Sequence, residues 1–162
     1  MKQSPTVQKD PFGCGAACIA FLTNRGYEEI VNLLGKNKAK KVGFYLRELC
    51  QLLRKLGYNC EYHYLTSKWR KRIYEEDTIV FIGRSKKYPY GHYLIRHKNF
   101  WMDPWINFPK NKNISQAKAG FRRRLPGKAI YAVFINPLKQ NKVGTKKSFK
   151  SNLFCAARLR KT

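Results

Sequence analysis

The chain has 162 residues, 43% hydrophobic and 14% aromatic, which is enough to form one globular domain with a sizeable core. It carries 34 Lys and Arg residues against nine Asp and Glu residues, a formal net charge of +25. No stretch approaches the roughly 18 apolar residues of a membrane span, and the amino terminus lacks the apolar core of a signal peptide. We therefore expect a cytoplasmic protein, or one delivered to a target cell by a route that needs no signal peptide.

Helical periodicity dominates the first third of the chain, where glycines follow the apolar stretches. We expect helices over residues 14–25, 27–34 and 44–56, with Gly26 as the residue that ends the first of them. The basic stretch 36–41 has no apolar face, and we expect it to be a loop. These segments predict a helical unit at the amino end.

β-branched and aromatic residues, alternating with polar ones, dominate the following part. We expect strands over residues 59–65, 78–82 and 129–135, and a hairpin over 92–103. Residues 69–76 are expected to be a short basic helix or loop, 83–90 a loop at the rim of a site, and 115–124 a weak helix.

A cysteine lies where the first helix is expected to begin. Pro11, Gly13 and Gly15 disfavour helix up to Cys14, and small residues flank the sulfur. The positive end of the helix dipole and the unpaired N–H groups of the first turn favour a thiolate at this position. Cys14 is therefore a candidate nucleophile. The alternative, an inert core thiol, fits poorly with two flanking glycines.

The expected hairpin carries a histidine and an aspartate. A turn centred between His97 and Lys98 would place His92 directly opposite Asp103 on the same face of the sheet, with Cβ atoms about 5 Å apart. An aspartate in that place can orient an imidazole. A slip of one residue would move Asp103 to the other face.

The sequence resembles papain-like cysteine peptidases in the order and local sequence context of four features: Gln8, Cys14, Gly91-His92-Tyr93 and Asp103-Pro104. The resemblance is closest to the bacterial double-glycine (bacteriocin) leader peptidase branch, as a stand-alone member, and covers roughly residues 6–135. The chain departs from the usual pattern at Phe12-Gly13, just before the cysteine.

The resemblance implies an α+β, papain-like two-lobe fold, in which an N-terminal helical lobe carrying the nucleophile packs on an antiparallel β-sheet carrying the histidine and aspartate. It implies that Cys14 attacks, His92 is the general base and Asp103 orients it. Gln8 and the Cys14 backbone N–H would form the oxyanion hole.

We expect the papain-like domain to span residues 1–137 and a basic C-terminal extension to span 138–162. Candidates for lining the substrate groove are Gly13, Tyr90, Gly91 and Trp105. Trp105 could alternatively serve only to cover Asp103 from water.

Basic residues concentrate towards the carboxyl end, where no acidic residue follows Asp103. This field favours contact with an acidic protein, a nucleic acid or an anionic surface, and the simpler alternative is a solvated surface. The candidate contact residues are Arg122, Arg123, Arg124, Lys146 and Lys147.

The five cysteines show no paired metal-ligand spacing, so no metal and no cofactor is expected. Cys18 and Cys50 are expected to be small buried apolar residues.

Three functions remain open at this point. The first is a thiol hydrolase that cleaves a peptide or amide bond in a peptide or protein substrate. The second uses the same triad for glutamine deamidation or acyl transfer, as a toxin or effector would. The third is a nucleic-acid- or polyanion-binding protein with a vestigial cysteine site.

Overall fold

The computed structural model describes residues 3–137 of the chain. The expected extension over 138–162, with Lys146 and Lys147, lies outside the described residues. The amino-terminal elements are α1 (Cys14–Thr23), α2 (Tyr27–Leu34), α3 (Lys36–Lys41) and α4 (Leu46–Lys55). The remaining elements are β1 (Cys60–Tyr64), α5 (Ser67–Arg70), the 3₁₀ turn η1 (Lys71–Tyr74), β2 (Ile79–Ile82), β3 (His92–His97), β4 (Phe100–Asp103), the 3₁₀ turn η2 (Ile114–Gln116), β5 (Gly120–Arg122) and β6 (Ala129–Ile135).

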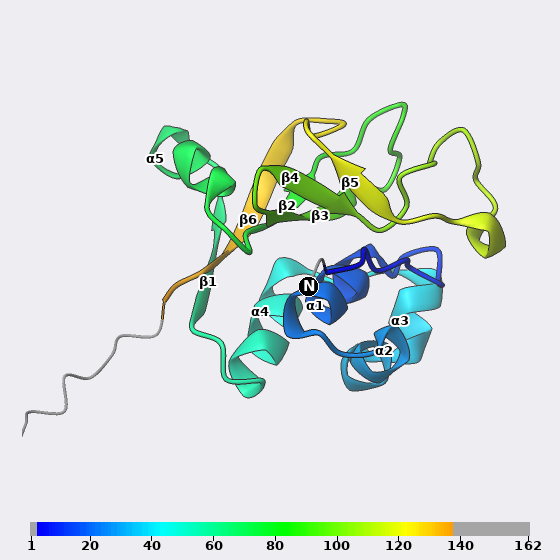
Figure 1. Ribbon diagram of the computed structural model, residues 1–162, viewed down its shortest axis with the longest axis horizontal. Helices are drawn as coiled ribbons and strands as arrows, with labels where there is room; N and C mark the ends of the chain where they lie inside the picture. Colours follow the sequence, from blue (N-terminus) through cyan, green and yellow to red (C-terminus); the bar gives the residue numbers. More distant parts are fainter. Residues whose placement is uncertain (1–2, 138–162) are drawn as a thin grey trace, which may run out of the picture.

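The strands form one antiparallel sheet in the order β1-β6-β2-β3-β4-β5. Helices α1 to α4 gather on one side of this sheet, and α1 packs directly against β3 (Figure 1). The predicted mixture of helices and antiparallel sheet is confirmed. Among the described residues, no helix has both the length and the apolar character that crossing a bilayer requires.

Helix α1 lies at the centre of the core. Every residue from Gly15 to Phe21 is buried, because α2 and α4 cover the sides that β3 leaves open. Cys18 is fully buried, and so is Cys50 on α4, as predicted for small apolar side chains. A second apolar cluster around Leu94 and Trp101 fills the opposite face of the sheet. The core thus holds α1 rigidly beneath the sheet.

The helical boundaries differ from the expectation in two places. The stretch expected to be a basic loop is helix α3, because lysine and alanine are good helix formers and Ala39 packs in the core. Helix α1 ends earlier than expected, with Asn24 in the left-handed conformation as its cap. Gly26 does not end α1 and instead forms the N-cap of α2.

The β-rich part also departs from expectation. Residues 115–124, expected to be weakly helical, hold η2 and strand β5, because the otherwise open edge of β4 pairs with residues 120–122. Tyr62 and Tyr64 are exposed although they share a face of β1 with buried Cys60. Contact with α4 near Cys60 explains the difference, since Arg54 and Cys50 of α4 both bond to Cys60.

The predicted register of the hairpin between β3 and β4 is wrong by two residues. Ile95 pairs with Met102 and His97 with Phe100, so the turn is centred between Lys98 and Asn99. Lys98 has a positive φ of 54°, as a tight two-residue turn demands. A shift of two residues preserves the side-chain face, so His92 and Asp103 still lie on the same face, as diagonal neighbours.

Gly91 sets the direction of the chain just before His92. Its φ is +71°, and an added Cβ would lie 2.1 Å from the Phe81 ring and 2.7 Å from the Ile82 carbonyl oxygen. We expect Gly91→Ser to lower the free energy of unfolding by at least about 2 kcal/mol, because strained backbone and overlap add. Gly26→Ser is the matched control, since nothing lies within 4 Å of its Cβ position. Equal free energies for the two variants in urea denaturation would contradict this account.

Candidate active site

Cys14 is the first residue of α1, and its neighbours leave the sulfur half-buried at the helix start. The preceding Gly13 is required by packing, because an added Cβ would lie 1.9 Å from the Tyr27 hydroxyl oxygen. That hydroxyl donates a 2.9 Å hydrogen bond to Asp10 Oδ2. Tyr27 of α2 therefore fixes the loop that leads into Cys14.

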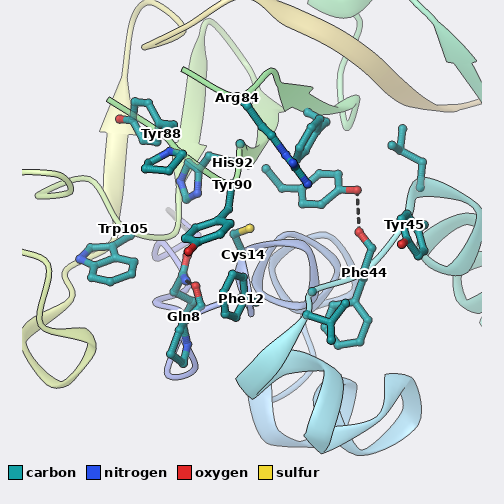
Figure 2. A pocket seen from close by; sticks show the side chains of 18 of the residues that line it. Gln8, Phe12, Cys14, Phe44, Tyr45, Arg84, Tyr88, Tyr90, His92 and Trp105 are labelled. Atoms are coloured by element: carbon teal, nitrogen blue, oxygen red, sulfur yellow. Dashed lines mark hydrogen bonds between the residues drawn. The ribbon is translucent and has the colours of Figure 1, made fainter. Parts of the chain in front are cut away.

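His92 and Asp103 form a buried pair at the ends of neighbouring strands. The His92 Nε2 and Asp103 Oδ1 atoms are 2.8 Å apart, and Asp103 has no exposed surface. The Tyr88 ring stacks on the imidazole with centroids 5.6 Å apart and planes 20° apart. This bond and this stacking leave Nδ1 as the ring nitrogen that is free to face Cys14, and Figure 2 shows His92 and Cys14 in the same cleft.

Two further groups bind the Asp103 carboxylate. The Trp105 backbone N–H donates to Oδ1 at 2.9 Å, and both Trp105 and Asp103 are buried. Arg122 of β5 places Nη2 2.7 Å from Oδ2 as an ion pair. The sequence places Arg122 among the candidate surface cations and does not predict this contact. No local signal could have revealed it, because it depends on β5 pairing with β4.

The pKa values of this pair are displaced in opposite directions. Burial alone would lower the pKa of His92, but the hydrogen bond to Asp103 and the nearby Cys14 sulfur outweigh burial and raise that pKa to about 9. Burial would raise the pKa of Asp103, but hydrogen bonding and positive charge from His92 and Arg122 hold it below its usual range. The imidazolium–carboxylate form is therefore favoured at neutral pH.

Gln8 lies in the loop before α1 and is buried at the edge of the same cleft. Its backbone N–H donates to the Pro104 carbonyl at 3.2 Å, which ties this loop to the residues that follow Asp103. The side-chain Nε2 donates to the carbonyls of Asp10 at 3.0 Å and Pro11 at 3.3 Å. Within the described part of the chain, Gln8 Oε1 has no hydrogen-bond partner.

An open cleft of about 800 Å³ runs past Cys14 between the helices and the sheet. Three of the predicted groove residues, Tyr90, Gly91 and Trp105, line it, whereas Gly13 is buried beneath Tyr27 and does not. The exposed ring of Tyr90 meets the Phe12 ring edge to face, with centroids 5.1 Å apart (Figure 2). The volume of the cleft lies within the range of ligand-binding clefts.

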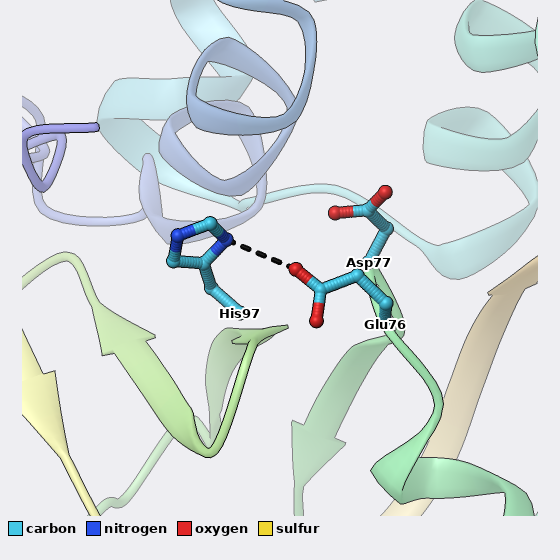
Figure 3. A group of neighbouring side chains, drawn as sticks. All are labelled: Glu76, Asp77 and His97. Atoms are coloured by element: carbon cyan, nitrogen blue, oxygen red, sulfur yellow. Dashed lines mark ion pairs between the residues drawn. The ribbon is translucent and has the colours of Figure 1, made fainter. Parts of the chain in front are cut away.

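Other candidate residues lie away from this cleft. Arg123 and Arg124 are exposed on the surface, where the predicted polyanion contact remains a prediction. Elsewhere on the molecule, Glu76, Asp77 and His97 gather, with His97 Nδ1 3.0 Å from Glu76 Oε1 (Figure 3). The Glu76–His97 ion pair accounts for this group, which lies at the turn before β2 and the end of β3.

The chain has the fold of a known peptidase domain. It is similar to the crystal structure of the peptidase domain of Streptococcus ComA, a bi-functional ABC transporter involved in a quorum-sensing pathway. The TM-score is 0.55 at 18% sequence identity, and the match covers 84% of this chain and 99% of the solved domain. No family model matches the sequence, and no curated protein matches it. The likeness is therefore one of fold.

The ion pair between Arg122 and Asp103 predicts a stability difference between adjacent arginines. Arg122→Gln should lower the free energy of unfolding by at least about 1 kcal/mol, because it leaves a buried carboxylate with one charged partner fewer. Arg123→Gln is the matched control, and its free energy should stay within about 0.5 kcal/mol of the wild-type value. Chemical denaturation measures both, and equal effects would contradict a role for Arg122 at Asp103.

The raised pKa of His92 predicts a pH-dependent stability. Its folded-state pKa of about 9 lies above the unfolded value of 6.5, so the stabilisation is fully present below pH 6.5 and is lost between pH 6.5 and 9. The difference in free energy of unfolding between wild type and His92→Gln should shrink across that range, by on the order of 1–3 kcal/mol. Urea denaturation at half-unit pH steps measures it, and a constant difference would refute the coupling.

Proposed function

We propose that this chain is a papain-like cysteine peptidase, of the type that cleaves double-glycine leader peptides, and that it hydrolyses amide bonds in a peptide or protein substrate. The main support for this proposal is that Cys14 lies at a helix start, in an open cleft that also contains His92, which is hydrogen-bonded to Asp103. The fold likeness to a solved peptidase domain supports the same assignment.

In the proposed reaction, the thiol proton of Cys14 has passed to His92 Nδ1 before substrate binds, which gives a thiolate–imidazolium pair. Asp103 holds Nε2–H and stabilises the imidazolium, which agrees with the raised pKa of His92. The sulfur attacks the substrate carbonyl carbon to give a tetrahedral oxyanion. His92 then protonates the departing amine, and water hydrolyses the remaining thioester.

The oxyanion would accept hydrogen bonds from the Cys14 backbone N–H and from Gln8 Nε2. Nε2 carries two hydrogens, both directed at carbonyl oxygens of its own loop, and the contact with Pro11 is the longer at 3.3 Å. We propose that this longer bond is exchanged for the oxyanion when substrate binds. The bond to Asp10 would keep the amide in place.

The shape of the cleft favours peptide hydrolysis over chemistry on one small group. A deamidase or acyl transferase needs to admit only one side chain or one acceptor, whereas this cleft is open and spans residues from β2, β6, α4 and the loops around Cys14. Mass spectrometry separates these reactions, because deamidation adds about one dalton without cutting the chain. If the chain were only a polyanion-binding protein, it would neither cleave nor deamidate any peptide.

The test is the cleavage of a synthetic library of decapeptides, randomised at every position, by the whole chain. Wild type should generate new peptide termini, and Cys14→Ala and His92→Gln should not. Cys18→Ala is the matched control, since its buried sulfur lies one helical turn further along α1. Deamidated but uncut peptides, or turnover that survives Cys14→Ala, would overturn the peptidase assignment.

The role of Gln8 can be separated from that of the nucleophile. Gln8→Ala should lower kcat for peptide cleavage by about 10²–10³-fold, because one oxyanion donor is lost. Alkylation of Cys14 by iodoacetamide forms no oxyanion, so its rate should stay within about twofold of wild type. Gln51→Ala, an exposed glutamine on α4, is the control. Parallel losses of cleavage and alkylation would show that Gln8 acts on the thiol or the loop instead.

A further inference from the structure

We propose that the cleft beside Cys14 recognises peptide segments that combine bulky apolar side chains with aspartate or glutamate, and that Arg47 and Arg84 bind the acidic side chains. This inference deepens the proposed function, on which it rests for the identity of the ligand as a peptide. It concerns the substrate class, and its test includes a binding measurement that needs no catalysis.

The charges that line the cleft all have the same sign. Arg47, Arg84 and Lys112 line it, and no aspartate or glutamate does. This absence is complete, because all nine acidic residues lie between positions 10 and 103, within the part of the chain that the structure describes. An acidic side chain entering the cleft therefore meets attraction without a competing carboxylate, whereas a basic side chain meets only repulsion.

The acidic residues are held elsewhere by structural contacts. Glu28, Glu29, Glu48, Glu61, Glu75 and Glu76 form ion pairs with neighbouring basic groups, Asp10 accepts from Tyr27, and Asp103 pairs with His92 and Arg122. The ninth, Asp77, lies beside Glu76 and His97, outside the cleft lining. The positive character of the cleft is thus a stable feature of the fold.

Arg47 and Arg84 come from opposite sides of the cleft. Arg47 lies in the first turn of α4, and Arg84 lies in the loop that follows β2. Figure 2 shows the Arg84 side chain extending over the cleft on the side of Phe44 and Tyr45, away from Trp105. Within residues 3–137, neither arginine has an ion-pair or hydrogen-bonding partner. A guanidinium offers donors in a planar fork that matches a carboxylate.

Aromatic rings line the same cleft as these cations. Phe44, Tyr45, Tyr62 and Tyr131 line the cleft, and the two last are exposed on strands β1 and β6. Rings of this kind can bury apolar side chains of a ligand. Because a bound ligand excludes water from the cleft, an adjacent ion pair becomes stronger. The cleft therefore suits a segment in which apolar and acidic residues lie close together, and suits a purely acidic or purely apolar one less well.

The experiment must separate local recognition from the overall charge of +25. Immobilised Cys14→Ala protein is exposed to the randomised decapeptide library, and retained peptides are sequenced by mass spectrometry. In this background, Arg47→Glu/Arg84→Glu is compared with Lys55→Glu/Lys87→Glu, which makes the same change in net charge. Lys55 and Lys87 lie on α4 and on the loop after β2 but do not line the cleft. Thermal unfolding verifies folding, and Arg47→Gln/Arg84→Gln replaces the first variant if it does not fold.

We expect peptides retained by Cys14→Ala protein to be enriched in aspartate and glutamate together with apolar residues. Arg47→Glu/Arg84→Glu should reduce the acidic enrichment at least about threefold, and the lysine pair should leave it nearly unchanged. Equal reductions in both variants, or no acidic enrichment at all, would overturn the inference.

Cleavage of the same library by the wild-type chain distinguishes the two proposals. Acidic enrichment that depends on Arg47 and Arg84, in the absence of any cleavage, would refute the peptidase assignment and leave the acidic recognition standing. Cleavage without preference for acidic residues would do the reverse.

Discussion

The buried carboxylate of Asp103 is the group on which the site depends. It has no exposed surface, so its charge persists only because His92, the Trp105 N–H and Arg122 all bind it. These partners come from β3, from the segment after β4, and from β5. A single carboxylate therefore joins three parts of the chain and places the imidazole beside the helix that carries Cys14.

The same site shows how burial and charge oppose each other. Desolvation by itself would strip the proton from His92 and add one to Asp103, and the close contact between them reverses both tendencies. The raised pKa of His92 keeps a proton on the imidazole at neutral pH. In the proposed mechanism, that proton is the one later given to the departing amine.

The distribution of acidic residues gives the surplus of positive charge a structural meaning. Acidic side chains contact neighbouring loops and helices, as Asp10 does with Tyr27 and Glu48 with Lys38. The charged side chains that line the cleft are basic. Most of the nine acidic side chains thus take part in contacts within the fold. Within residues 3–137, Arg47 and Arg84 at the cleft have no ion-pair partner.

The sequence predicted local features well where one physical cause dominated. The helices at 27–34 and 44–56 and the strand at 129–135 follow from periodicity and from glycine at their ends. It failed where a neighbour decided the outcome. Residues 36–41 are helical because Ala39 docks in the core, and residues 120–122 are a strand because β4 offers an open edge. Neither neighbour can be identified from a local window.

The amino-acid sequence by itself determined that a cysteine would begin the first helix, since Pro11 and Gly13 disfavour helix before Cys14 and good helix formers follow Gly15. It also determined which face of the hairpin would carry His92 and Asp103, because strand geometry repeats every two residues and a register error of two leaves the face unchanged. Only the tertiary structure decided that Arg122 forms an ion pair with buried Asp103, and that none of the aspartate and glutamate side chains, all of which the structure describes, lines the cleft. Both depend on contacts between segments far apart in the chain, which local propensity and spacing do not encode.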